Sequence, residues 1–119
     1  MPYSPGEVAE RVGFSIDTLR YYERIGLLDG IARTPGGQRV FSDADISWLN
    51  LLRCLRDTGM PIARMQQFAE LVRSGNDTGA ERAALLEEHD RDIDARVAQL
   101  RTEQRRIREK ITWYRSASS

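Results

Sequence analysis

The chain has 119 residues, of which 40% are hydrophobic and 30% charged, enough for one compact domain and one long extension. Eighteen basic residues balance eighteen acidic ones, and residues 1–42 hold five arginines against five acidic residues, so composition alone does not favour nucleic-acid binding. No apolar run is long enough for a membrane span, and the N-terminus lacks the pattern of a signal peptide. The single cysteine, Cys54, excludes an internal disulfide and a cysteine metal cluster within one chain, which fits a reducing cytoplasm.

The first two elements are predicted to be short helices joined by a tight turn. Ser4 and Glu7 have the spacing of a capping box, and Gly13 would end that helix in a left-handed conformation. Ser15 is the N-cap candidate of a second helix, which Gly26 would end. Two short helices joined by about three residues form a helix-turn-helix.

The next segments predict a hairpin and two further helices. Residues 28–42 contain two short strand-like runs around a Pro-Gly-Gly turn at 35–37, which indicates a wing. Ser42 is an N-cap candidate for a third helix that ends near Gly59. The Met-Pro pair at 60–61 marks the start of a fourth helix, which stops before residue 75.

A long helix is predicted from Gly79 to Tyr114. From Ile93 onward its apolar residues, with Gln104 in one position, follow the 4, 3, 4, 3 spacing of a heptad seam. One apolar stripe on a charged helix needs a partner helix, and because the rest of the chain is too short to supply one, we expect a homodimer. Asp90 and Gln104 should weaken the seam and help to set its register. The predicted seam residues are Leu86, Ile93, Val97, Leu100, Ile107, Ile111 and Tyr114.

The second helix carries the residues most typical of DNA recognition. Ile16 and Leu19 are expected to point into the core, whereas Asp17, Arg20, Tyr21 and Arg24 should be exposed. Arginine can bond guanine O6 and N7 in the major groove, and tyrosine hydroxyls reach phosphates. The residues alone leave a second interpretation open, in which the two tyrosines pack in the core and the arginines are solvated.

Three motifs, at residues 18–28, 37–41 and 43–46, resemble the MerR family of bacterial regulators in the same order along the chain. The resemblance implies a mainly α fold: a winged helix-turn-helix with a small β-hairpin wing and a long C-terminal coiled-coil dimerisation helix. The implied domains are a DNA-binding domain at 1–75, with its wing at 28–42 and second-wing helices at 43–75, and a dimerisation helix at 76–119.

The resemblance also implies the function and the partners. Dimers of this family pair through antiparallel helices, bind an inverted repeat of double-stranded DNA within a promoter spacer, and distort it for RNA polymerase. In these terms Arg20 matches the base-contacting arginine, Tyr22 the phosphate-contacting aromatic residue and Arg39 the wing arginine. The full candidate set for DNA is Ser15, Asp17, Thr18, Arg20, Tyr21, Tyr22, Arg24, Arg39 and Arg64.

Three positions leave their roles open. Asp17 stands where some relatives have a basic residue, and it could accept from cytosine N4 or act as a capping carboxylate, which we favour. Phe41 stands where tyrosine is common, so a phosphate hydrogen bond should be lost there. Arg64 could contact a phosphate in the second wing or be a solvated arginine.

Cys54 is the candidate sensor residue. Residues 51–59 resemble the AdhR and NmlR subgroup of the family, small members with a single cysteine here that are linked to aldehyde or nitrosative stress. Arg53 and Arg56 are near in sequence, and a neighbouring cation favours the thiolate. The alternatives are a buried packing residue and a regulator without thiol sensing. Residues 76–119 hold no cysteine, and His89 alone cannot form a metal site, so we expect neither a metal nor a cofactor.

The sequence also bears on two other classes of protein. An enzyme is not expected, because the sequence shows no nucleophile paired with a base, no phosphate-binding glycine loop and no carboxylate pair in an apolar site. A coiled-coil interaction adaptor, or a DNA-packaging protein that regulates no promoter, remains an alternative to the regulator.

Overall fold

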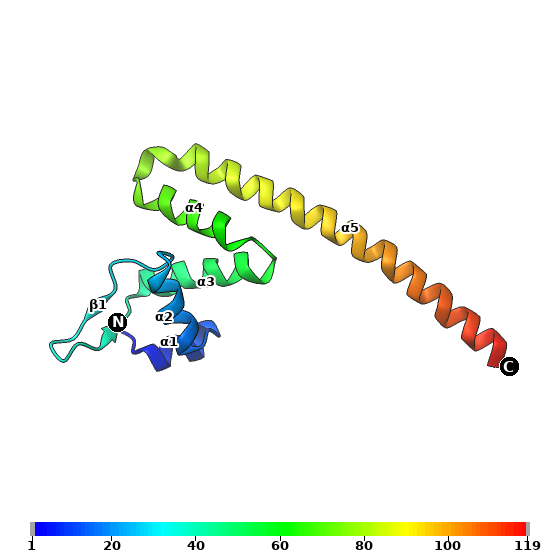
Figure 1. Ribbon diagram of the computed structural model, residues 1–119, viewed down its shortest axis with the longest axis horizontal. Coiled ribbons are helices and arrows are strands. Elements are labelled where there is room, and N and C mark those ends of the chain that lie inside the picture. The colour runs from blue at the N-terminus through cyan, green and yellow to red at the C-terminus, as the bar shows by residue number, and fades with distance from the viewer. Residues whose placement is uncertain (1, 119) are drawn as a thin grey trace. The chain divides into compact units, whose positions relative to one another are not determined.

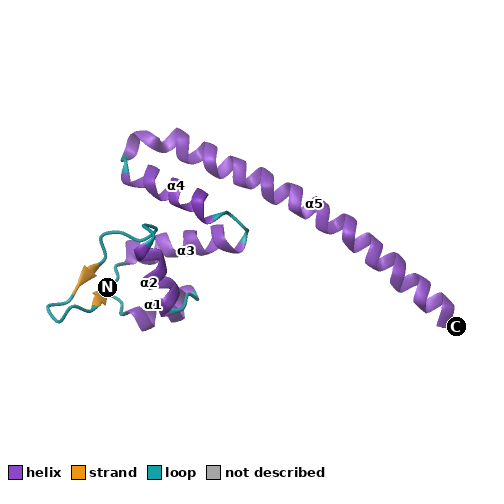
Figure 2. Ribbon diagram, in the orientation of Figure 1, coloured by secondary structure: helices purple, strands orange, loops and turns teal. Residues whose placement is uncertain are grey.

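The structure, a computed structural model, describes residues 2–118 and is mainly helical (Figures 1 and 2). Its contacts divide the chain into two compact units, one up to Arg82 and one from Ala83. The elements in chain order are α1 (Pro5–Val12), α2 (Ile16–Arg24), β1 (Ala32–Arg33), β2 (Arg39–Val40), α3 (Asp43–Asp57), α4 (Ile62–Arg73), the 3-10 turn η1 (Asn76–Thr78) and α5 (Gly79–Ser118).

The helix starts follow the capping residues. The Ser4 hydroxyl accepts from the Glu7 backbone N–H while the Glu7 carboxylate accepts from the Ser4 N–H, so the predicted capping box is present. Ser42 forms a second capping box, with Asp45. Gly13 ends α1 at φ 83°, a left-handed conformation that favours glycine.

The wing is a small antiparallel hairpin (Figure 2) in which Ala32 pairs with Val40 and Arg33 with Arg39. Each strand is only two residues long, and Leu28, which precedes the hairpin, is buried in the core. Phe41 extends the pairing by exchanging two backbone hydrogen bonds of 2.8 Å with Tyr3. The wing predicted at residues 28–42 is therefore present with shorter strands than the sequence indicated.

The core of the first unit lies between α1, α2, α3 and α4. Trp48 of α3 stacks on Phe68 of α4 with ring centroids 5.8 Å apart. The buried apolar side chains of these helices are Val8, Val12, Leu19, Tyr22, Leu49, Leu52, Leu55, Met65, Phe68 and Ala69. This core holds α2 against the two later helices.

The helix α5 is continuous over 40 residues, a few more than the sequence indicated. Its predicted stripe residues from Val97 onward are exposed in the single chain. Of the helices described, none is long and apolar enough to cross a membrane. The contact boundary after Arg82 lies within the first turn of α5, and the predicted functional division at residues 75 and 76 stays a prediction.

Candidate DNA-binding surface

The exposed face of α2 carries four polar or aromatic side chains. An α-helix turns about 100° per residue, so Asp17, Arg20, Tyr21 and Arg24 fall on one arc, and all four are exposed as predicted. Leu19 occupies the opposite side and is buried. The second helix of the helix-turn-helix therefore presents arginines and a tyrosine on one continuous face.

Weak contacts pre-position these side chains without burying them. The Arg24 guanidinium lies over the Tyr21 ring, 5.5 Å from its centroid. Arg20 lies 4.0 Å from the Asp17 carboxylate, and both side chains are mostly exposed. Exposed pairs of this kind contribute little free energy, so a nucleic acid could displace them at small cost.

The burial of Tyr22 does not favour the phosphate contact that was expected of it. Tyr22 is only 2% exposed and packs edge-on against Phe14, with ring centroids 5.2 Å apart. It follows Leu19 by three residues and so shares its buried face. Burial raises the pKa of the Tyr22 hydroxyl, and the nearby Arg56 guanidinium offsets part of that rise. The exposed aromatic residue on α2 is Tyr21, at 40%.

The expectation that Ile16 points into the core is wrong. Ile16 is 41% exposed, whereas Leu19 and Phe14 are 3% and 2% exposed. It borders a hollow of about 420 Å³ between α2 and the wing, together with Arg20, Gln38 and Arg39.

The wing arginine, Arg39, forms an ion pair with Glu23 of α2. Arg39 donates to the Glu23 carboxylate from Nε at 2.9 Å, and its Nη2 lies 2.7 Å from the same oxygen. Arg33 on the paired strand lies 3.6 Å from that carboxylate. The expected DNA contact of Arg39 has a competitor in Glu23, since the Arg39 side chain is only 26% exposed. The pairing of Glu23 with Arg39 was not predicted from the sequence. The only sign of it there is that Glu23 is an acidic residue among the arginines of α2.

Side chains from α3 and α4 hold the end of α2. Trp48 Nε1 donates to the Leu27 carbonyl at 2.7 Å, Gln66 to that of Ile25 at 3.0 Å and Arg73 to that of Gly26 at 2.7 Å. These carbonyls follow the last turn of α2 and have no partner within the helix. Three donors far away in sequence therefore set the position of the recognition helix, and no local pattern could have revealed them.

Ser15 caps the start of α2, and Asp17 lies in its first turn. The Ser15 hydroxyl accepts from the Thr18 N–H at 3.1 Å and lies 2.9 Å from the Thr18 hydroxyl. The Asp17 side chain is exposed 4.0 Å from Arg20, and its negative charge in the first turn also interacts favourably with the positive helix end. Phe41 is 1% exposed, and Arg64 is half-buried on α4.

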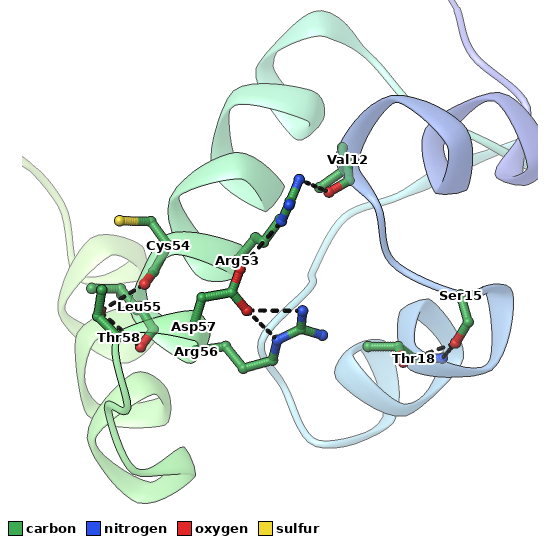
Figure 3. Close-up of polar contacts among 9 residues, drawn as sticks. All are labelled: Val12, Ser15, Thr18, Arg53, Cys54, Leu55, Arg56, Asp57 and Thr58. Atoms are coloured by element: carbon green, nitrogen blue, oxygen red, sulfur yellow. Dashed lines mark hydrogen bonds and ion pairs between the residues drawn. The ribbon is translucent and has the colours of Figure 1, made fainter. Parts of the chain in front are cut away.

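The Cys54 thiol is exposed on α3 (Figure 3), which does not fit a buried packing residue. Figure 3 shows its sulfur pointing away from both neighbouring guanidinium groups. Arg53 donates to the Val12 carbonyl at 2.8 Å, and Arg56 makes two hydrogen bonds to Asp57. The two arginines expected to activate the thiol thus hold α1 and the end of α3 instead.

The exposed stripe of α5 contains a shallow hollow of about 460 Å³ beside Val97, Leu100, Gln104 and Ile107. Large apolar side chains exposed in a row mark an interaction surface. Within residues 2–118, no cluster of three or more histidine, cysteine or acidic residues could hold a metal ion, and His89 is buried on α5.

Comparison with known proteins identifies the family. The model of the MerR HTH family regulatory protein matches residues 3–71, and that of the MerR DNA-binding region matches residues 46–110. An uncharacterised HTH-type transcriptional regulator of Haemophilus influenzae is 36% identical over all of this chain and 88% of its own length. The regulator AdhR of Bacillus subtilis is 34% identical over 67% of this chain and 57% of its own length.

Solved structures agree with these matches. HiNmlR, a MerR family regulator lacking the sensor domain and bound to promoter DNA, has a TM-score of 0.89 and 36% identity over 99% of this chain and 94% of that one. A MerR family regulator from Bacillus thuringiensis has a TM-score of 0.84 and 28% identity over 94% and 98%. These relatives are transcriptional regulators and not enzymes, and they support the AdhR- and NmlR-like subgroup. The chain belongs to the MerR family of DNA-binding, helix-turn-helix transcriptional regulators.

Proposed function

We propose that the protein acts as a homodimer that binds an inverted repeat within a promoter spacer. The observation that carries this proposal is the exposed face of α2, where Arg20, Tyr21 and Arg24 stand together on a helix that α3 and α4 hold in place. The net charge of zero gives little general attraction to DNA, so affinity must come from such placed contacts.

In this proposal residues 1–75 bind DNA and residues 76–119 dimerise. Arg20 reads a base, Tyr21 takes the phosphate-contacting role first expected of Tyr22, and Arg24 contacts the backbone. Ser15 and Thr18, at the start of α2, lie where helix N-termini meet phosphates or base edges. The wing arginine Arg39 and the second-wing Arg64 contribute phosphate contacts. For this contact Arg39 exchanges its ion pair with Glu23 for one with a DNA phosphate.

The dimer is formed by the exposed stripe of α5, paired antiparallel as the family resemblance implies. Each protomer then contributes the same seven seam residues, from Leu86 to Tyr114, to an isologous contact. Two recognition helices held at a fixed separation match the symmetry of an inverted repeat. The bound dimer bends and untwists the spacer for RNA polymerase in the cytoplasm, at a cost of about 1–6 kcal/mol by elastic estimates.

A mobility-shift assay with a duplex selected from a random pool tests the proposal. We expect an inverted repeat to be recovered and to stay bound in excess random DNA, because base contacts and not charge supply the affinity. A DNA-packaging protein would show no preference for the repeat, and an adaptor would give no shift. Either result would refute the regulator.

We further propose that Cys54 responds to electrophiles such as aldehydes, which its exposure and the similarity to AdhR support. The competing function is regulation without thiol sensing. It is favoured because Arg53 donates to the Val12 carbonyl and Arg56 to the Asp57 carboxylate, so their guanidinium groups are engaged away from the thiol. Promoter output should be compared before and after formaldehyde or methylglyoxal treatment, in the native protein and in Cys54→Ser. An equal response in the two proteins would exclude the sensor role and leave the DNA-binding function intact.

A further inference from the structure

Ile16 is an apolar side chain in an unexpected place. It is the first residue of α2, and it is 41% exposed, whereas Leu19 on the same helix is 3% exposed. Arg20 follows Ile16 by four residues, so both side chains lie on the same side of the helix, one turn apart. The core therefore does not account for the exposed surface of Ile16.

Ile16 lies at the edge of a hollow between α2 and the wing. This hollow is lined by the polar side chains of Arg20, Gln38 and Arg39 and by the apolar side chains of Pro5, Leu19 and Phe41. In helix-turn-helix proteins the N-terminal residues of the second helix contact base edges in the major groove. The polar neighbours can bond phosphates or bases, but Ile16 offers only methyl and methylene groups.

We infer that Ile16 reads the C5-methyl group of a thymine, beside the guanine that Arg20 would read. The thymine methyl is the one apolar group that bases present in the major groove. Four helical residues span about 6 Å, and base pairs rise about 3.4 Å, so the thymine should lie within about two base pairs of that guanine. This inference rests on the proposed DNA-binding function and adds a second specificity residue to it.

Replacing thymine by uracil, which lacks only the methyl group, tests the inference directly. Half-sites recovered by the native protein from a random duplex pool are re-synthesised with each thymine changed to uracil in turn. We expect one position per half-site, within two base pairs of a guanine, to weaken binding about fourfold. That change corresponds to about 0.8 kcal/mol for one buried carbon group, at 1.4 kcal/mol per tenfold.

Two variants complete the experiment. Ile16→Ala should bind thymine and uracil duplexes equally at that position, because its side chain no longer reaches the methyl group. Arg24→Ala is the matched control from the same face; it should weaken binding to both duplexes and keep their fourfold ratio. Circular dichroism checks that Ile16→Ala keeps its fold, as expected for an exposed residue.

Three outcomes would overturn the inference. No sensitive thymine position in the native protein would exclude a methyl contact. A ratio that persists in Ile16→Ala would assign the methyl to another residue. If no duplex at all is recovered, the proposed function fails and the inference fails with it, so the two failures are distinguishable.

Discussion

Truncating Ile107 to alanine should weaken the association of the proposed dimer and leave the helix intact. Ile107 lies on the predicted seam and is 62% exposed in the single chain, the highest exposed fraction among the seam residues. Alanine has a higher helix propensity than isoleucine, so α5 should stay helical in the variant. Any loss of association then reports the lost contact between the two copies.

The size of the effect follows from the exposed fraction. The truncation removes three carbons, and burying each carbon in the interface contributes about 0.8 kcal/mol. Because 62% of Ile107 is exposed in the single chain and available for burial, each copy loses about 1.5 kcal/mol of association free energy. Because an isologous interface contains the residue twice, the dimer loses about 3 kcal/mol. The dimer dissociation constant should therefore rise roughly 100-fold.

Sedimentation equilibrium measures that constant, and Thr102→Ala provides the matched control. Thr102 is exposed on the side of α5 opposite the stripe, so its truncation should leave the constant unchanged. Operator binding at low protein concentration should fall in Ile107→Ala and recover as the concentration rises. An unchanged dissociation constant in Ile107→Ala, or an equal rise in Thr102→Ala, would refute the seam.

Three further predictions concern binding and stability. Arg20→Ala should weaken specific binding by about 1–3 kcal/mol and relax preference at one base position per half-site; an equal loss on random DNA, measured by competition, would show a phosphate contact. Trp48→Phe leaves the Leu27 carbonyl without its 2.7 Å donor, so the free energy of unfolding should fall by about 1–3 kcal/mol, and an unchanged urea midpoint would contradict this. Hydrogen bonds from Arg56 lower the pKa of the Asp57 carboxyl in the folded protein. The ionised carboxylate therefore contributes its full free energy of stabilisation above the pKa of the unfolded chain, and this contribution is lost as the pH falls through the pKa of the folded protein. Asp57→Asn should therefore reduce the acid loss of stability measured by urea unfolding at several pH values, and a pH profile identical to the native one would argue against this pair.

Much of the backbone could be predicted because its signals are local. Ser4, Ser15 and Ser42 each accept a hydrogen bond from a backbone N–H three residues later, an interaction that depends on no other part of the chain. Gly13 ends α1 because a left-handed residue costs glycine little. The heptad spacing on α5 likewise needs only the helix itself to bring its apolar residues to one side.

The side chains of α2 could be assigned only in part from the sequence. A nine-residue helix shows its periodicity over too few turns to decide which of two adjacent tyrosines is buried. Tyr22 packs against Phe14 and is buried, while Tyr21 is exposed to solvent. Ile16 is 41% exposed although Leu19, on the same helix, is 3% exposed.

The sequence by itself determined the order of the elements, most helix boundaries, the apolar stripe of α5 and the family, because capping, periodicity and motif order act over a few residues. Only the tertiary structure decided that Tyr22 is buried, that Glu23 binds Arg39 and that Trp48, Gln66 and Arg73 hold the end of α2. These contacts join residues from 16 to 47 positions apart. Their geometry exists only after the helices have packed, and so no local pattern encodes it.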